Sequence, residues 1–177
     1  IEVMTGNDAS VIEAHENAFL AFGGTPEPTE LPNNNSSVQA TVLSDGRSAL
    51  VFNHASRLDA TDRRTGLYDD IEDESGPVIA ATAERAPACE KTAFWGAPRA
   101  PMTLAISADD GRTWPVQRTL EEGDGYCMTN NSKDGLNREF SYPSITQTPD
   151  GDLQIAFTYW RRAIKHVRVA PGWAERD

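Results

Sequence analysis

The chain has 177 residues and carries 27 acidic against 16 basic side chains, which gives a formal net charge of −11 at pH 7. This length fits one domain. The negative charge argues against a nucleic-acid partner, because no basic stripe is present to neutralise phosphates. No segment reaches the length of a membrane-spanning helix, so we also expect no membrane span.

Cysteine and histidine usage gives no sign of a metal centre. The two cysteines, Cys89 and Cys127, allow either one disulfide or two free thiols. No Cys/His cluster has the spacing of a zinc site, so we expect no metal or other cofactor. The chain starts at Ile1 without an initiator Met, which fits a processed or truncated product. We expect a secreted or periplasmic location and leave a cytoplasmic one open.

In chain order, the first segment with a pattern is "VIEAHENAFLAF" (residues 11–22), which predicts a short amphipathic helix or a degraded strand. Residues 23–35, "GGTPEPTELPNNN", are typical of a loop. Three later segments then share one plan: a β-prone run, a polar Asp-Gly turn and a second β-prone run. They are "SSVQATVLSDGRSALVFNHAS" (36–56), "APMTLAISADDGRTWPVQRTL" (100–120) and "YPSITQTPDGDLQIAFTYW" (142–160).

The spacing of these hairpins predicts an all-β fold. Their turn glycines, Gly46, Gly111 and Gly151, lie 65 and 40 residues apart. A hairpin unit that recurs every ~40 to 50 residues is typical of a β-propeller with four-stranded antiparallel blades. The longer interval is explained if residues 57–92, which are charged and without periodicity, form a loop insertion.

The chain is too short for a whole propeller. Six blades need roughly 300 residues at this repeat length, so residues 1–177 supply about half of one, or about three blades. An open half-propeller would leave unpaired strand edges. We therefore expect a partial propeller domain whose partner is the remainder of the same propeller, either earlier blades or a second chain.

The stretch "SADDGRTW" (107–114) predicts a hairpin that stabilises itself. Ser107, Asp109 and Thr113 can bond to backbone groups in the turn, and Trp114 can cover it. The stretch resembles the Asp-box, S-x-D-x-G-x-T-W, of the BNR-repeat proteins in the sialidase (neuraminidase) superfamily. All five specified positions are present. The resemblance implies a six-bladed propeller of the sialidase type.

Two further matches imply site residues. In the family a nucleophilic Tyr lies eight residues before the Asp of a Pro-Asp-Gly turn, and Tyr142 and Asp150 have this spacing. A phenol suits this chemistry, because an anionic carboxylate nucleophile would be repelled by the carboxylate of sialic acid. The family also places an arginine eight residues before the Ser of an Asp-box, as Arg99 lies before Ser107. This guanidinium would grip the substrate carboxylate.

The chain departs from the family where the partners of these residues are expected. Ser37 lies where the Glu that activates the Tyr should be, and Asn53 or His54 lies near an expected second arginine. Thr158 replaces a Glu that orients another arginine. We expect Asn53 to contact the substrate instead, and His54 to be a candidate base because its ordinary pKa suits proton transfer near neutrality.

Glu139 is the other candidate base for Tyr142. Residues i and i+3 point to opposite faces of a strand, so Glu139 can serve Tyr142 only if the backbone bends between them. The segment "YWRRAIKHVRV" (159–169) adds basic side chains to an acidic chain. It forms either a cationic patch that receives an acidic sugar or a strand pair with solvent-facing charges; its members are Arg161, Arg162, Lys165 and His166.

From the resemblance we expect an exo-acting, retaining glycoside hydrolase that releases sialic acid or a related acidic sugar from a glycan substrate. Tyr142, Glu139 and His54 are the catalytic candidates. The substrate-binding candidates are Arg99, Arg161, Arg162 and Asn53. One alternative is a glycan-binding propeller without catalysis, since fold alone does not fix function. Another is a lyase that acts on uronate-type glycans.

Overall fold

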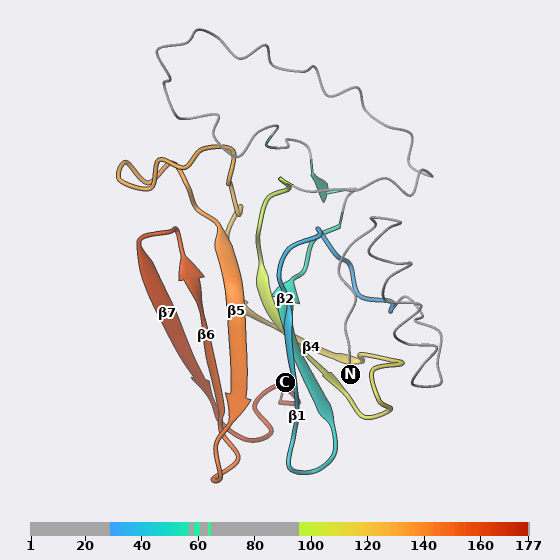
Figure 1. Cartoon of the computed structure of the whole chain (residues 1–177). Helices are drawn as coiled ribbons and strands as arrows, with labels where there is room; N and C mark the ends of the chain where they lie inside the picture. Colours follow the sequence, from blue (N-terminus) through green and yellow to red (C-terminus); the bar gives the residue numbers. More distant parts are fainter. Residues whose placement is uncertain (1–28, 57–58, 61–63, 65–95, 177) are drawn as a thin grey trace, which may run out of the picture.

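The computed structural model describes residues 29–56, 59–60, 64 and 96–176. They form two antiparallel sheets (Figure 1). One sheet has the order β1 (Gln39–Val42), β2 (Ser48–Asn53), β3 (Met102–Ser107) and β4 (Val116–Glu121). The other has the order β5 (Phe140–Gln147), β6 (Leu153–Tyr159) and β7 (Ala163–Val169). The described residues contain no helix long and apolar enough to cross a membrane.

The three predicted hairpins are present. They are β1–β2, β3–β4 and β5–β6, and the glycine of each turn has a positive φ, as at Gly111 (φ 84°). Such a φ costs glycine nothing, whereas other residues avoid it. The segment predicted over residues 11–22 lies outside the described residues.

The assignment of these hairpins to three blades was wrong. The first two hairpins share one sheet, because β2 pairs with β3 from Ser48↔Ser107 to Asn53↔Met102. The described chain therefore contains one four-stranded sheet, as expected of a blade, and one three-stranded sheet. Residues 54–101 connect β2 to β3, which are neighbours in the sheet. Nearly all of the predicted insertion (57–92) lies outside the described residues, so its loop character stays a prediction. Closure into six blades stays a prediction.

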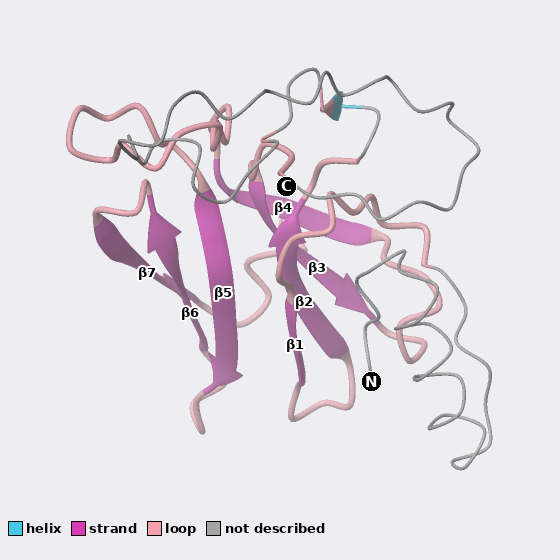
Figure 2. Cartoon of the chain, turned by 45° about the horizontal axis from the view of Figure 1, so that its top comes forward, coloured by secondary structure: helices cyan, strands magenta, loops and turns pink. Residues whose placement is uncertain are grey.

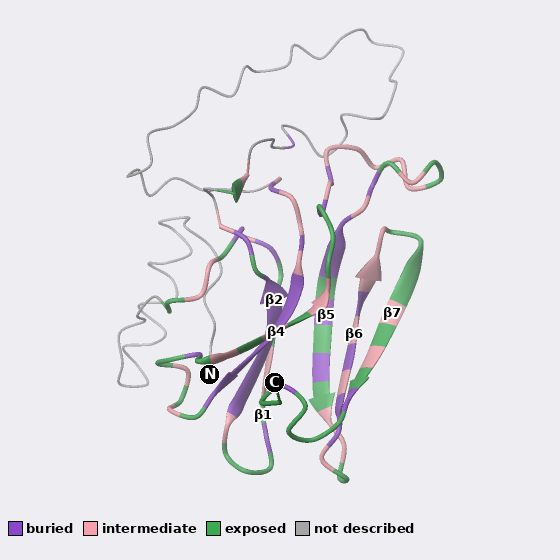
Figure 3. Ribbon diagram, turned by 180° about the vertical axis from the view of Figure 1, so that it is seen from behind, coloured by how far each residue is buried: buried purple, intermediate pink, exposed green. Residues whose placement is uncertain are grey.

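The two sheets pack against each other, with β5 beside β1 and β2 (Figure 2). Their facing sides share one apolar core, which includes Val51, Leu104, Phe140, Ile155 and Phe157. Strand β2 is buried on both faces (Figure 3), because its other face also packs against apolar side chains. That second cluster contains Leu50, Phe52, Ala105 and Trp114 and is covered by Leu31, Val38 and Ala40.

The antiparallel topology separates two ends of the molecule. One end gathers the C-terminus of β2, the N-termini of β3 and β5, and the β6–β7 turn (Figure 1). The opposite end gathers the β1–β2, β3–β4 and β5–β6 turns. The sequence candidates for catalysis lie at the first end and the Asp-box turn lies at the second.

Candidate active site

The Asp-box turn is a structural unit. Ser107 Oγ accepts from Gly111 N at 2.9 Å and donates to Asp109 Oδ1 at 2.8 Å. The Thr113 backbone N–H donates to Asp109 Oδ1 at 2.9 Å, and its hydroxyl donates to Oδ2. Trp114 is 1% exposed and donates from Nε1 to Gly111 O. These bonds confirm the self-stabilised hairpin.

The same hydrogen bonds lower the pKa of Asp109. The backbone N–H of Thr113, followed by the hydroxyls of Thr113 and Ser107, lowers the pKa of Asp109 to about 2. An anion held by several donors is stabilised relative to its protonated form. Asp109 is therefore ionised near neutral pH and serves the turn, which lies at the end of the sheet away from Tyr142.

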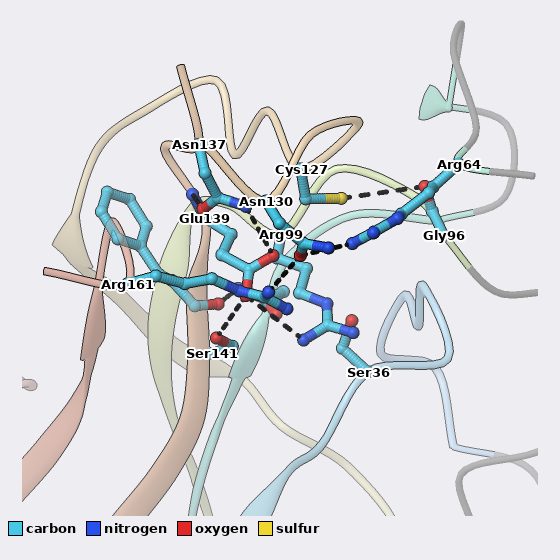
Figure 4. Close-up of polar contacts among 12 residues, drawn as sticks. Ser36, Arg64, Gly96, Arg99, Cys127, Asn130, Asn137, Glu139, Ser141 and Arg161 are labelled. Atoms are coloured by element: carbon cyan, nitrogen blue, oxygen red, sulfur yellow. Dashed lines mark hydrogen bonds and ion pairs between the residues drawn. The ribbon is translucent and has the colours of Figure 1, made fainter. Parts of the chain in front are cut away.

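The candidate site is built around the buried carboxylate of Glu139, which directly precedes β5. Glu139 is 1% exposed. Arg161, in the β6–β7 turn, donates from Nε to Glu139 Oε1 at 2.7 Å, and Arg99 Nη1, just before β3, lies 3.8 Å from the same oxygen (Figure 4). Ser141 Oγ donates to Oε1 at 3.0 Å and Asn137 Nδ2 donates to Oε2 at 3.4 Å. Three hydrogen-bond donors and one further guanidinium, from three chain segments, thus converge on one carboxylate.

The electrostatics of this cluster keep Glu139 ionised. Burial alone would raise its pKa, but the hydrogen bond from Arg161 and the positive charges of Arg99 and Arg161 outweigh burial and lower it. Burial lowers the pKa of Arg161, but the hydrogen bond to Glu139 and the negative charge of Glu139 raise it, and the net effect is a raised pKa. The pair is therefore charged on both sides, and the second guanidinium leaves an excess of positive charge in the cluster.

Tyr142 joins this cluster through Arg99. The guanidinium carbon of Arg99 lies 5.7 Å from the centroid of the Tyr142 ring, within the range of a cation–π contact. Tyr142 is 62% exposed, an unusual position for a large side chain in a strand. The β5–β6 pairing shifts register between Ser141 and Ser144, and Tyr142 has φ 53°. This irregularity bends β5 and turns the phenol outward.

Backbone strain is concentrated at the same end of the molecule. Tyr142, Trp160 and Arg161 have φ values of 53°, 54° and 52°. A left-handed conformation costs roughly 1–2 kcal/mol for residues with a Cβ. The other described non-glycine residues with positive φ are Asn35 and Asp110, whose residue types tolerate it. Strained bulky residues tend to gather at functional sites, where the surrounding contacts hold them. Here Tyr142 lies in β5, and Trp160 and Arg161 lie in the β6–β7 turn, where the Trp160 backbone N–H donates to Glu139 O at 2.9 Å.

Asn53 is a buried residue that contacts the backbone next to Glu139. It is 2% exposed and donates from Nδ2 to the backbone oxygen of Phe140 at 3.1 Å, next to Glu139. Its Oδ1 is buried without a hydrogen-bond partner among the described residues. The substrate contact expected of Asn53 stays a prediction.

The structure does not bring His54 or Arg162 to Glu139. The His54 ring stacks on Phe52 at 5.6 Å, and Phe52 belongs to the cluster on the face of the sheet opposite to Asn53. Arg162 is exposed in the β6–β7 turn, where its backbone N–H donates to Tyr159 O.

Sequence reasoning missed two members of the cluster, Arg64 and Asn130. Asn130 Oδ1 accepts from Arg64 Nη1 at 2.8 Å and also from Arg161 Nη1, so it bridges two guanidinium groups (Figure 4). Arg64 is 7% exposed. No pattern singled it out, because it lies in a segment that was interpreted as a solvated insertion. A third arginine therefore lies beside the two that approach Glu139.

Cys127 lies next to the cluster as a free, buried thiol. Its Sγ donates to Ala97 O at 3.1 Å. Burial, together with the negative charge of Glu139, raises the pKa of Cys127 to about 11. It is therefore protonated near neutral pH and unsuited to nucleophilic chemistry. Its possible partner Cys89 lies outside the described residues. Among the described residues, no group of His, Cys, Asp and Glu side chains could hold a metal ion.

Comparison with known proteins identifies one family. The sequence profile of the BNR repeat-like domain matches residues 16–155. This match spans both sheets as far as the start of β6, and it includes Arg99, Glu139 and Tyr142. No curated protein and no solved structure gives a significant match.

Proposed function

Because the chain belongs to the family of BNR repeat-like domains, we propose that its Arg99–Glu139–Tyr142 cluster acts on sialic acid or a related acidic sugar, as part of an exo-acting, retaining glycoside hydrolase. The observation that carries the proposal is the pairing of an exposed phenol with a guanidinium 5.7 Å from its ring. The phenol of Tyr142 can attack the anomeric carbon of the sugar, and the guanidinium of Arg99 can bind its carboxylate.

Arg99 serves as the carboxylate clamp in this proposal. A guanidinium binds a carboxylate with two parallel hydrogen bonds, which fixes the orientation of the ligand as well as its position. Arg99 Nη1 lies 3.8 Å from Glu139 Oε1, beyond ordinary hydrogen-bond length, so the group keeps donors for a ligand. Arg161 and Arg64 add positive charge to the same end of a chain whose net charge is −11.

Tyr142 serves as the nucleophile. Its oxygen forms a bond to the anomeric carbon as the bond to the aglycone oxygen breaks, and the aglycone leaves as an alcohol, with the phenol proton balancing its oxygen. The oxygen of water then bonds to the same carbon as the sugar–tyrosine bond breaks, and the proton that water loses restores the phenol. Two displacements on the same carbon retain the anomeric configuration. The outward position of Tyr142 at the irregular point of β5 leaves its hydroxyl accessible to such a substrate.

Glu139 has a different role in this proposal from the base suggested by the sequence. Its lowered pKa and its ion pairs with Arg161 and Arg99 make it a weak proton acceptor. We assign it as a positioning residue that holds both guanidinium groups in place. His54 has no part in the proposal, since its ring stacks on Phe52 on the other face of the sheet.

A second candidate function is glycan binding without turnover. One observation favours it: in the described part of the chain, no carboxylate hydrogen-bonds the hydroxyl of Tyr142. The lyase alternative, which would use Tyr142 and His54 together, has less support, because the contact described for the His54 ring is its stacking on Phe52.

The test is release of a fluorogenic aglycone from an α-sialoside by the protein and by Tyr142→Phe. We expect loss of turnover in Tyr142→Phe, with binding of free sialic acid retained. Tyr126→Phe is the matched control, because Tyr126 lies under Arg138 at 5.1 Å and that arginine pairs with Asp124 instead of Glu139. Equal turnover in wild type and Tyr142→Phe would refute the nucleophile, and binding without turnover in wild type would establish the second candidate function.

A further inference from the structure

A cavity of about 320 Å³ lies at the end of the molecule opposite to Glu139. Its lining residues come mainly from three segments: the β1–β2 turn, the β5–β6 turn and the chain that follows β7. Its floor belongs to the shared core and consists of Leu43, Ile106, Leu153 and Val169. Neither the Asp-box nor the Arg99–Tyr142 cluster uses this cavity.

Polar contacts across the rim hold the cavity in shape. The Ser44 backbone N–H donates to Gln147 Oε1 at 2.7 Å, which ties the β1–β2 turn to the β5–β6 turn. Arg47 pairs with Asp45 at 2.8 Å and with Glu175, which ties the β1–β2 turn to the C-terminal segment. A site built in this way is formed before a ligand arrives, so binding does not require the three segments to be ordered first.

Trp173 lines the cavity and is 39% exposed. Exposure of this much of an indole ring to water is unfavourable, because burial of its apolar surface is favourable. An indole that lines a hollow with polar groups offers apolar surface for the C–H face of a sugar ring. The volume fits a ligand of one or two sugar rings.

The rim offers both kinds of hydrogen-bonding group. Arg47 and Gln147 carry donors, and the carboxylates of Asp45, Asp150 and Glu175 are acceptors. Asp150 also lies 3.9 Å from Arg168 Nη2, so three carboxylates face two arginines, and the remaining negative charge disfavours an anionic ligand. A cationic amine would use only the acceptors, whereas a hydroxyl both donates and accepts. This mixture of donors and acceptors therefore matches a neutral polyol better than an anion or a cationic amine.

We propose that this cavity is a second carbohydrate site, which binds a neutral sugar ring stacked on Trp173 with its hydroxyls bonded to the Arg47–Asp45–Glu175 rim. The proposal does not rest on the function assigned to Tyr142. If the function proposed for the Arg99 cluster also holds, the protein has two chemically different glycan contacts at opposite ends of the two sheets: one for a carboxylate-bearing sugar and one for a neutral sugar.

The test is saturation-transfer NMR of the protein with glucose, galactose, mannose, fucose and N-acetylglucosamine, each at millimolar concentration. We expect transfer to at least one sugar, and a loss of at least tenfold in affinity in Trp173→Ala. Arg47→Met keeps the aliphatic stem but removes the donors, so it should weaken the same sugar severalfold. Binding of N-acetylneuraminic acid should be unchanged in Trp173→Ala, because that ligand belongs to the Arg99 cluster.

No transfer to any sugar, or transfer that persists undiminished in a folded Trp173→Ala variant, would overturn the proposal. Competition by methylammonium in place of a sugar would reassign the cavity to amines. If both variants fail to fold, NOEs in the wild-type protein between sugar C–H protons and the Trp173 indole decide the question, and their absence in the bound state counts against the site.

Discussion

Replacement of Glu139 by Gln tests whether this carboxylate holds the arginine cluster together. Gln has nearly the same shape and keeps an acceptor for Ser141, so the change removes mainly charge. Breaking a fully buried ion pair costs about 3–5 kcal/mol. The partner side chains here are 33% exposed for Arg161 and 23% for Arg99, so we expect about 1–3 kcal/mol after allowance for solvent screening.

The pH dependence of this difference separates charge from packing. The pKa of Glu139 is lower in the folded protein than its ordinary value of 4.5. A depressed carboxyl pKa contributes stability that is fully present above the unfolded pKa and is lost as the pH falls through the folded pKa. The stability gap between wild type and Glu139→Gln should therefore be constant from pH 7 to about 5 and narrow below pH 4.5.

Urea unfolding at a series of pH values measures this gap directly. Glu121→Gln is a suitable control, because Glu121 pairs with Lys165 in a more exposed setting, and removal of such a pair costs about 0–1 kcal/mol. Equal stability of wild type and Glu139→Gln at pH 7 would refute the reasoning. So would a gap that does not change between pH 7 and pH 3.

Three further predictions concern the hairpins and the thiol. Gly46→Ala should lower the free energy of unfolding by about 1 kcal/mol through strain alone, because Gly46 has φ 88° and an added Cβ meets nothing within 4 Å; a neutral result in urea titration would contradict this. Asp109→Ala should lower Tm more than Asp110→Ala, since Asp109 bonds to Ser107 and Thr113, and equal Tm values would rule out the assigned bonds. Cys127, with a pKa of about 11 and a buried thiol, should resist iodoacetamide at pH 8 until the protein unfolds, and peptide mass mapping that found rapid alkylation of the folded protein would show the thiol to be exposed.

The hairpins could be predicted from the sequence because each depends on neighbouring residues. An Asp-Gly turn and the alternating runs beside it fix a hairpin locally. The grouping of hairpins into sheets could not be predicted in the same way. The pairing of Ser48 with Ser107 spans the whole connection over residues 54–101, and no local pattern encodes it. The six-bladed closure and the partner that supplies further blades stay predictions.

In the site, too, motif spacing predicted some residues, whereas contacts between distant segments could not be predicted. Arg99 and Tyr142 were placed by motif spacing, and the structure does bring them together. Glu139 and Tyr142 could face the same side of β5 only if the backbone bends. The structure has an irregularity at this point: the register of β5 shifts between Ser141 and Ser144, and Tyr142 has a φ of 53°. The sequence could not show that Glu139 faces two arginines, because Arg161 reaches it from another strand pair.

The most direct test of the account asks whether the Arg99 cluster recognises a carboxylate. Binding of the methyl α-glycoside of sialic acid and of its carboxyl methyl ester can be compared by NMR titration on the wild-type protein and on Arg99→Ala. Loss of a charge-assisted bidentate contact is worth about 1.5–3 kcal/mol, so we expect the ester to bind wild type at least tenfold more weakly than the acid, and this preference to collapse in Arg99→Ala. Equal affinity of acid and ester for the wild-type protein would contradict the account.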